Sequence, residues 1–301
     1  MTLVIALGGN ALVRAGERGT AAEQLAALRD TIAVLAPLVR EGDVVVTHGN
    51  GPQVGNELLR QERAADEVPP LPLWLAVAQT QAEIGALIVS ELAPVAARPV
   101  ACLVTHVQVD EGDQAFELPT KPIGPFYSEG QAKALERERG WQLVEDAGRG
   151  FRRVVASPAP LDIVEVDSIR ALVASGAIAV ACGGGGIPVT KRNGKLKGID
   201  AVIDKDRASA LLARQLGATQ LLILTEVPAV YRAFGTESPE ELRQLTADQA
   251  EGLLPELPPG SMRPKVEAAI DLARAGGETL ITSQKALSAA LEGRAGTRIT
   301  A

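Results

Sequence analysis

Glycine-rich turns that follow short apolar runs are the segments of this sequence best suited to chemistry. Gly49 and Gly51 follow the apolar run 44–46, and Pro52 then has the fixed φ favoured at the first position of a helix. This order predicts a strand, a turn and a helix whose free N–H groups favour an anion. An ordinary tight turn would contain the same two glycines. Asn50 between them, with His and Gln nearby, favours the anion site.

Two more glycine turns follow predicted strands. The strand over residues 3–7 ends in Gly8, Gly9 and Asn10, and the strand over residues 177–182 ends in four glycines. A helix between the first two strands completes a right-handed βαβ unit over residues 1–56. The turns after the strands over residues 3–7 and 44–46 therefore belong to the carboxyl edge of one parallel sheet, where open α/β sheets bind ligands.

Two lysines near predicted helix starts would add positive charge to this edge. Lys205 and Lys265 each begin a helix, although either one alone is more simply a surface charge. The G-x-G-x-x-G and P-loop motifs are both missing, but repeated glycine turns and lysines can hold a polyphosphate and a second anion face to face. Phosphoryl transfer needs mainly positioning and charge neutralisation. An acceptor that is already an anion needs no general base, so a sequence with only two histidines is compatible with this reaction.

The elements that would position these groups alternate between helices and strands. Thr20 and Glu23 have capping-box spacing, so a helix is expected to begin there, with Pro37 kinking or shortening its last turn. Asn193-Gly194 indicates a hairpin, and Ser238 and Thr246 carry helix-start signals. Further elements are expected as a helix over 73–92, a strand over 100–109, a helix over 167–175, a strand over 221–225, a strand over 278–282 and a strand over 297–300. The pattern predicts a three-layer αβα fold around an open, mainly parallel sheet.

Residues 110–155 interrupt this alternation and predict a protruding lid subdomain. The segment is rich in proline, glycine, aromatic residues and charge, with a polar helix at about 128–139. Prolines on both sides of Lys121 and the nearby arginines favour a rigid cationic flap over a solvated excursion without function. Taken with the glycine turns, this divides the chain into an N-terminal lobe over 1–182, which includes the lid, and a C-terminal lobe over 183–301.

Composition limits the partners and the location. A net charge of −7 argues against nucleic acid, because a phosphate backbone requires a basic face. No apolar stretch is expected to reach the roughly 20 residues of a membrane span, and the first residues lack the basic region of a signal peptide. The expected location is the cytoplasm. Cys102 and Cys182 lie in apolar runs, so both are expected to be buried and inert.

Seven segments together resemble carbamate kinases of the amino acid kinase family, in order over almost the whole chain. The segments are 6–11, 47–56, 119–127, 145–155, 183–189, 201–210 and 260–268. The lid segments are more specific for this resemblance than the glycine turns, which the wider family shares. The resemblance implies reversible phosphoryl transfer between carbamoyl phosphate and ADP, giving ATP and carbamate, with Mg²⁺ and in a homodimer.

The resemblance also implies roles for particular residues. Carbamate and the transferred phosphoryl group would bind the N-terminal lobe at Gly8, Gly9, Asn10, Gly49, Asn50 and Gly51. Lys121 would come from the lid, Lys205 and Lys265 would neutralise the moving phosphoryl group, and Asp206 would orient them. The nucleotide, as ATP or ADP, would lie on the C-terminal lobe near Thr225, Tyr231, Met262 and Lys265. No protein ligand to a metal is implied.

Three positions depart from the family pattern near the expected nucleotide. Arg263 replaces a glycine in the stretch Gly260-Ser261-Met262-Arg263-Pro264-Lys265, and Glu226 and Pro228 stand where aspartates are typical. Two other functions therefore stay open. One is a kinase of another small carboxylate on the same fold, and the other is a ligand-binding regulator without catalytic activity.

Overall fold

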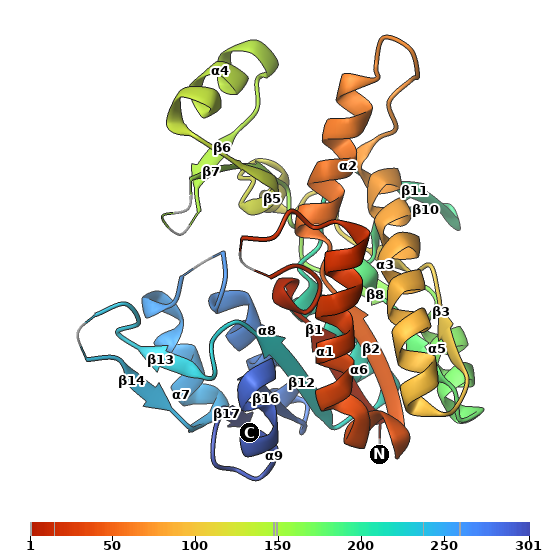
Figure 1. Ribbon diagram of the computed structural model, residues 1–301, viewed down its shortest axis with the longest axis vertical. Helices are drawn as coiled ribbons and strands as arrows, with labels where there is room; N and C mark the ends of the chain where they lie inside the picture. Colours follow the sequence, from red (N-terminus) through yellow and green to blue (C-terminus); the bar gives the residue numbers. More distant parts are fainter. Residues whose placement is uncertain (1, 15, 147, 149, 237, 259) are drawn as a thin grey trace.

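A sheet of eight strands passes through the molecule between two layers of helices (Figure 1). The computed structural model describes residues 2–14, 16–146, 148, 150–236, 238–258 and 260–301. The strand order is β15-β17-β16-β12-β1-β2-β9-β3, and all neighbours are parallel except β16 and β17. The strands are β1 (Thr2–Leu7), β2 (Asp43–His48), β3 (Val100–Cys102), β9 (Ile178–Val180), β12 (Gln220–Thr225), β15 (Gln244–Thr246), β16 (Glu278–Ser283) and β17 (Thr297–Thr300). The mainly parallel sheet is confirmed.

Alternate residues of each strand enter the two helical layers, because successive side chains in a strand point to opposite faces. On β1, Ile5 and Leu7 belong to the core beneath α1, α3 and α9, whereas Val4 and Ala6 belong to the core beneath α5, α6, α7 and α8. These helices are α1 (Ala21–Arg40), α3 (Leu73–Ala96), α5 (Val166–Ala174), α6 (Lys205–Leu216), α7 (Ala247–Leu253), α8 (Arg263–Arg274) and α9 (Leu287–Leu291). The expected three layers are therefore present.

Two of the predicted helix starts are confirmed, whereas the expected effect of Pro37 and the helix start at Ser238 are not. Thr20 and Thr246 both cap helices through capping boxes. Pro37 does not shorten α1, which continues to Arg40 because its buried face packs against the sheet on both sides of the proline. The helix start expected at Ser238 is wrong, since the chain there forms β14 (Glu240–Leu242), paired with β13 (Val230–Arg232).

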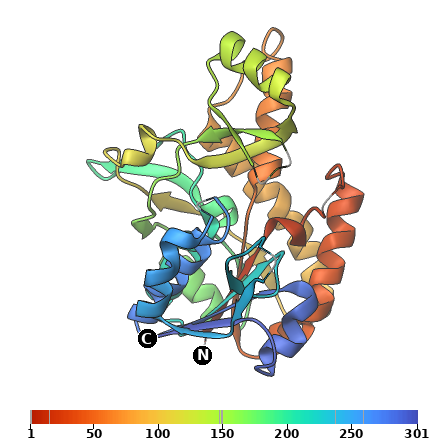
Figure 2. The same ribbon diagram turned by 90° about the vertical axis from the view of Figure 1, so that its left-hand side faces the viewer.

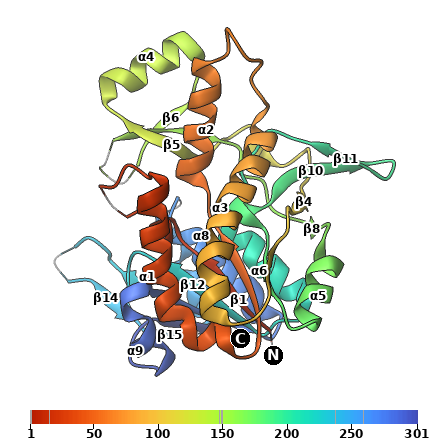
Figure 3. The same ribbon diagram turned by 45° about the vertical axis from the view of Figure 1, so that its right-hand side comes forward.

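A second, four-stranded sheet lies beside the main one, in the order β11-β10-β4-β8. Its strands are β4 (His106–Gln108), β8 (Asp162–Ile163), β10 (Ile187–Arg192) and β11 (Lys195–Gly198). The hairpin of β10 and β11 turns at Asn193-Gly194, as expected, and projects outward (Figure 3). Because β10 pairs with β4, the second sheet joins segments from both predicted lobes, and the lobe boundary at residue 183 stays a prediction.

The single strand expected over 100–109 is wrong, because the chain changes sheet in the middle. Residues 100–102 form β3 in the main sheet, and residues 106–108 form β4 in the second sheet. Gln81 holds the bend between them: its side chain accepts from the Thr105 backbone N at 2.9 Å and donates to the Thr105 backbone O at 3.0 Å. Cys102 ends β3 at the edge of the main sheet and is exposed, so the expectation of burial is correct for Cys182 only.

Helix α3 contradicts the expectation that no apolar stretch reaches the length of a membrane span. Its 24 residues are long and apolar enough to cross a bilayer by length and composition. The helix is nevertheless a core element, because Ile84, Ile88 and Leu92 are fully or almost fully buried against the main sheet. A buried core helix can therefore have the same composition as a membrane span.

The lid is a three-stranded antiparallel sheet with one helix on it. It contains β5 (Lys121–Tyr127), α4 (Glu129–Arg139), β6 (Leu143–Glu145) and β7 (Phe151–Val155), in the strand order β5-β7-β6. The lid and α2 (Gly51–Arg63) stand together beyond the end of the main sheet (Figures 1 and 2). On α2, Glu62 forms ion pairs with two lid arginines, Arg139 at 2.6 Å and Arg153 at 3.4 Å.

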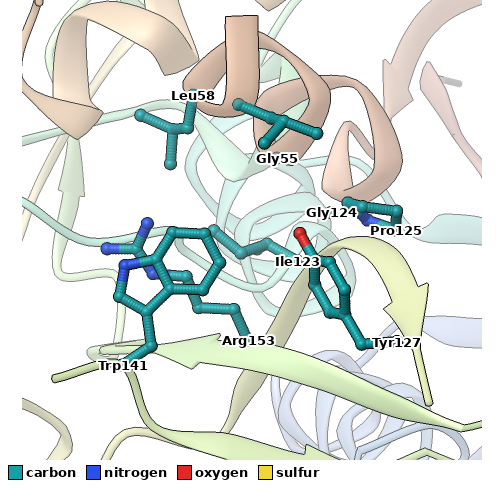
Figure 4. Close-up of a pocket in the computed structure, with 9 residues that line it drawn as sticks. Gly55, Leu58, Ile123, Gly124, Pro125, Tyr127, Trp141 and Arg153 are labelled. Carbon is teal, nitrogen blue, oxygen red and sulfur yellow. The ribbon is translucent and has the colours of Figure 1, made fainter. Parts of the chain in front are cut away.

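Between α2 and the lid, a small pocket is lined by the side chains shown in Figure 4. The Arg153 guanidinium lies over the Trp141 ring, 4.5 Å from its centroid. Beside the pocket, the backbones of Gly55 on α2 and Gly124 on β5 touch. A Cβ on Gly55 would lie 2.0 Å from the Gly124 Cα, so the helix and the strand can approach this closely only through glycine.

Substituting Gly55 by alanine is therefore expected to destabilise the protein by about 2 kcal/mol, because the new methyl group overlaps backbone that cannot rotate away. Urea unfolding of Gly55→Ala measures this loss. Gly130→Ala in α4 is the matched control, since a Cβ there meets nothing within 4 Å, and we expect no loss of stability. Equal stability of the Gly55 variant and the wild type would contradict the close packing of the lid on α2.

Candidate active site

The turns after β1 and β2 meet at the carboxyl edge of the main sheet. The two strands are paired in parallel up to Leu7 and His48, and the Gly49 N–H donates to the Leu7 backbone O at 3.2 Å. Gly8 touches the neighbouring strand β12, where a Cβ would lie 2.4 Å from the Leu224 backbone O. The backbone of this turn is therefore packed against the C-terminal half of the sheet, and Gly9 beside it is exposed.

The third glycine turn, Gly183–Gly185, closes over Asn50. Gly184 has a φ of +64°, and a Cβ there would lie 2.3 Å from the Asn50 side chain. The Asn50 amide donates to the Thr80 Oγ1 at 2.9 Å and is buried. The side chain of Asn50 thus holds two turns and a helix together, which leaves ligand binding at this turn to the backbone N–H groups at the start of α2. The side chain of Asn10 lies outside the described part of the structure.

Three lysines converge on two aspartates at the start of α6. Lys205 pairs with one oxygen of Asp206, and Lys265, from the first turn of α8, pairs with its other oxygen at 3.1 Å. Lys121, the first residue of β5 in the lid, pairs with Asp204 at 2.5 Å. We call these five residues the lysine–aspartate cluster. They bring together the lid, α6 and α8, and the four predicted catalytic residues, Lys121, Lys205, Asp206 and Lys265, all belong to the cluster.

The cluster adjoins the glycine turn after β2. A Cβ on Gly49 would lie 3.2 Å from the Lys205 Cδ, so the Lys205 side chain passes directly beside this turn. On the lid side, a Cβ on Gly51 would lie 3.6 Å from the Pro122 backbone O and 3.8 Å from the Arg152 guanidinium. The turn after β2 and the cations of the lid, α6 and α8 therefore lie at one site.

Burial and ion pairing have opposite effects on the pKa values of the cluster. Burial alone would raise the pKa of the Asp206 carboxyl, but Lys205 and Lys265 lower it below its ordinary value. Burial alone would lower the pKa of Lys265, but Asp206 and Asp204 raise it. For Lys205 burial is the stronger effect, so its pKa is lowered. With three lysines and two aspartates, the cluster has one more basic than acidic side chain, which favours an anion.

Sequence reasoning missed Asp204 as a member of the site. Burial would raise the pKa of its carboxyl, but Lys121 and Lys265 hold the pKa well below its usual range. The Asp204 side chain also caps α6, where its Oδ1 accepts from the Asp206 N–H at 2.9 Å. An aspartate directly before a helix is a recognised capping signal, but the lysine that pairs with it comes from a segment 83 residues away.

The nucleotide-binding candidates come from three elements. Thr225 ends β12 beside Ser283 of β16, and its Cα lies 3.6 Å from a Cβ built on Gly8. Met262 caps α8, in the same turn as Lys265. The Tyr231 ring packs against Phe234, with 5.9 Å between centroids. In the described ranges no hydrogen bond joins Tyr231 to the lysine–aspartate cluster, and its role stays a prediction.

The positions that depart from the family pattern lie around the same helix start and the loop after β12. Arg263 begins α8, and its Nε is buried without a hydrogen-bond partner among the described residues. Pro228 lies in the loop between β12 and β13.

His48 supplies no acid–base function at neutral pH. Its ring is buried at the end of β2, and burial, together with the smaller effect of the Lys205 charge, lowers the pKa to about 4. The Nδ1 atom lies 3.0 Å from the Gly49 backbone O. The neutral ring therefore packs beneath the glycine turn as a structural group, and the site contains cations and amides without a nearby base that titrates at pH 7.

The buried His48 predicts a loss of stability in mild acid. The folded state binds fewer protons than the unfolded state between the ordinary pKa of 6.5 and about 4, so lowering the pH through this range favours unfolding. The expected loss is about 3 kcal/mol. Urea unfolding at pH 7 and pH 4.5 measures it, with His48→Gln as the control that cannot take up this proton. An equal loss in both proteins would contradict the assignment.

Comparison with known proteins identifies the family. The model of the amino acid kinase family matches residues 1–283, so the chain belongs to this family. A carbamate kinase from Pyrococcus horikoshii is 44% identical over 99% of this chain and 98% of its own length. One from Staphylococcus haemolyticus is 46% identical over the same shares of the two chains. The resemblance to carbamate kinases found from the sequence motifs is confirmed.

Solved structures agree with this result. Carbamate kinase from Giardia lamblia bound to citric acid superposes with a TM-score of 0.93, at 39% identity and covering 99% of this chain and 98% of that chain. The same enzyme bound to AMP-PNP gives a TM-score of 0.88, with the same identity and coverage. These findings support carbamate kinase activity, which is that of a phosphotransferase.

Proposed function

We propose that this chain transfers a phosphoryl group reversibly between carbamoyl phosphate and ADP, giving carbamate and ATP. The observation that carries the proposal is the convergence of Lys121, Lys205 and Lys265 beside the glycine turn of β2. Fixed cations and amides around one point stabilise the charge that a phosphoryl group spreads over its oxygens in the transition state. The full-length similarity to carbamate kinases identifies carbamate as the acceptor.

In this proposal each of the two predicted lobes holds one substrate. Carbamoyl phosphate binds at Gly8, Gly9, Asn10 and the turn Gly49-Asn50-Gly51. ADP binds the C-terminal lobe near Thr225, Tyr231, Met262 and Lys265. Binding of an adenine nucleotide, though not the choice of these residues, is supported by the Giardia lamblia enzyme, which was solved bound to AMP-PNP.

The transfer requires one bond to break and one to form at phosphorus. The bond from phosphorus to the carbamate oxygen breaks, and a bond to an oxygen of the ADP β-phosphate forms. Both leaving and attacking groups are anions, so no proton moves and no general base is needed. Lys205 and Lys265 neutralise the phosphoryl oxygens, Lys121 approaches from the lid, and Asp206 holds the first two lysines in register. The lid excludes water from carbamoyl phosphate, which otherwise hydrolyses.

Mg²⁺ fits this site as an ion bound by the nucleotide. Within the described residues no group of three histidine, cysteine or acidic side chains could hold a metal, and both cluster carboxylates already pair with lysines. Mg²⁺ is commonly bound through substrate phosphates with few protein ligands. When bound, it would reduce the negative charge of the phosphates. A homodimer is a further proposal that derives from the resemblance to carbamate kinases, and a cytoplasmic location is one that derives from the composition of the sequence.

The direct test is ATP formation from carbamoyl phosphate and ADP with Mg²⁺, coupled to a luciferase readout. We expect turnover that depends on both substrates and on the enzyme. ADP release from ATP should be measured in parallel with bicarbonate and ammonia, acetylglutamate or glutamate as acceptors. Activity with one of the amino acids alone would favour the kinase of another carboxylate. Folded protein without activity or ADP binding by calorimetry would favour the non-catalytic regulator.

A further inference from the structure

The carboxylate of Asp204 divides its two oxygens between two tasks. Oδ1 accepts from the backbone N–H groups of Asp206 at 2.9 Å and Arg207 at 3.3 Å, which caps α6. Oδ2 accepts from the Lys121 Nζ at 2.5 Å. One rigid side chain thus fixes a lid lysine relative to the helix that begins with Lys205.

A cap alone does not require this carboxylate. Ser, Thr and Asn cap helices about as well as Asp, and Thr20, Ser128 and Thr246 have that role elsewhere in this chain. What Asp204 adds is a negative charge that is 9% exposed and faces a lysine of the lid that is 23% exposed. Without a negative partner, Lys121 would approach two other cations, Lys205 and Lys265, and be repelled by them.

The two aspartates therefore have parallel arrangements. Asp206 uses both oxygens to hold the two lysines of the C-terminal lobe, and Asp204 holds the third lysine, which comes from the lid. Lys121 is also the first residue of β5, and its backbone pairs with Val155 of β7 at the base of the lid sheet. The Lys121–Asp204 ion pair therefore fixes the base of the lid relative to α6.

We propose that Asp204 is a positioning residue that docks the lid lysine Lys121 beside Lys205 and Lys265. It acts through Lys121 and does not contact the transferred group. The catalytic part of this inference rests on the proposed function, and the docking part does not.

A double-mutant cycle tests the catalytic part. Asp204→Asn and Asp204→Ser both keep an oxygen acceptor that can cap α6 and remove the charge, so at least one folded variant is expected. We expect kcat to fall on the order of 10²-fold, the loss typical of a misplaced group in an active site, with little change in the KM for ADP. In the Lys121→Met variant, the same Asp204 substitutions should lower kcat by less than about threefold further. The reason is that the lysine that Asp204 positions is already gone. Losses that multiply in the double variants would show that Asp204 acts independently of Lys121 and would overturn the proposal.

Chemical labelling tests the docking without any substrate. Folded protein is treated with a trace of acetic anhydride, and the labelling of Lys121 is compared by mass spectrometry with that of Lys133, an exposed lysine in α4 of the same lid. We expect the ratio to rise in Asp204→Asn and Asp204→Ser, because the released amine becomes accessible. An unchanged ratio would overturn the docking.

The control for both experiments is Asp113→Asn. Asp113 caps a short helix, accepting from the Ala115 N–H at 2.8 Å, and pairs with no lysine in the described residues. We expect it to leave kcat and the Lys121 labelling at wild-type values. A wild type that makes no ATP would refute the proposed function, while the labelling ratio would still decide whether Asp204 docks Lys121.

Discussion

Replacing Lys205 by methionine is expected to lower kcat for ATP formation by about 10³-fold while the protein remains folded. The side chain is only 10% exposed and lies beside Gly49, so its ammonium group acts in a site from which most water is excluded. A fixed donor in such a site stabilises developing charge by far more than it would in water, and losing one donor typically costs 10²–10³-fold. Methionine keeps most of the apolar contact of the lysine stem.

The measurement is steady-state ATP formation, with circular dichroism to confirm folding. Lys195→Met is the matched control, because Lys195 is exposed on β11 in the projecting hairpin and should retain wild-type kcat. A Lys205 variant within tenfold of the wild type would show that this ammonium group does not neutralise the transferred group. Lys265→Met should show a loss of similar size, since it pairs with the same aspartate.

Substituting Asp206 by asparagine is expected to destabilise the protein by about 3–5 kcal/mol, because it leaves two buried ammonium groups without their shared partner. The Asp206 side chain is 2% exposed and contacts both Lys205 and Lys265. Urea unfolding at pH 7 measures the loss. Asp167→Asn is the matched control, since Asp167 forms an exposed ion pair in α5 and should change stability by less than about 1 kcal/mol.

The pH dependence of the same variant provides a second check. Burial would raise the pKa of Asp206, but Lys205 and Lys265 lower it in the folded protein. The stabilisation from this carboxylate is therefore present at neutral pH and is lost as the pH falls below the ordinary pKa of 3.8. The wild type and Asp206→Asn should therefore become more similar in stability in acid. A constant difference between them from pH 7 to pH 3 would contradict the ion-pair assignment.

Both predictions concern side chains that hold charge inside the protein, and they separate two roles. Lys205 is expected to affect the transition state more than the folded state, because Lys265 still pairs with Asp206 when Lys205 is absent. Asp206 is expected to affect both, since no other carboxylate in the described structure pairs with either lysine. Measuring kcat and stability for both variants therefore distinguishes neutralisation of the substrate from organisation of the site.

The sequence by itself determined the features that depend on neighbouring residues. The apolar run before each glycine turn, the capping boxes at Thr20 and Thr246 and the turn at Asn193-Gly194 act within a few residues, and the structure contains all of them. Four of the five cluster residues could also be named, because their motifs resemble those of carbamate kinases. The parallel pairing of β1 and β2 follows from the helix that connects them in the βαβ unit.

Only the tertiary structure decided which distant groups meet. The Lys121–Asp204 pair, the bend that splits 100–109 between two sheets and the exposure of Cys102 all depend on where the lid, α3 and the sheet edge lie in space. The apolar composition of α3 likewise became interpretable only once its partners were known. Local patterns specify each element because backbone hydrogen bonds and caps are short-range, whereas burial and ion pairing are set by contacts between elements that the chain brings together only when it folds.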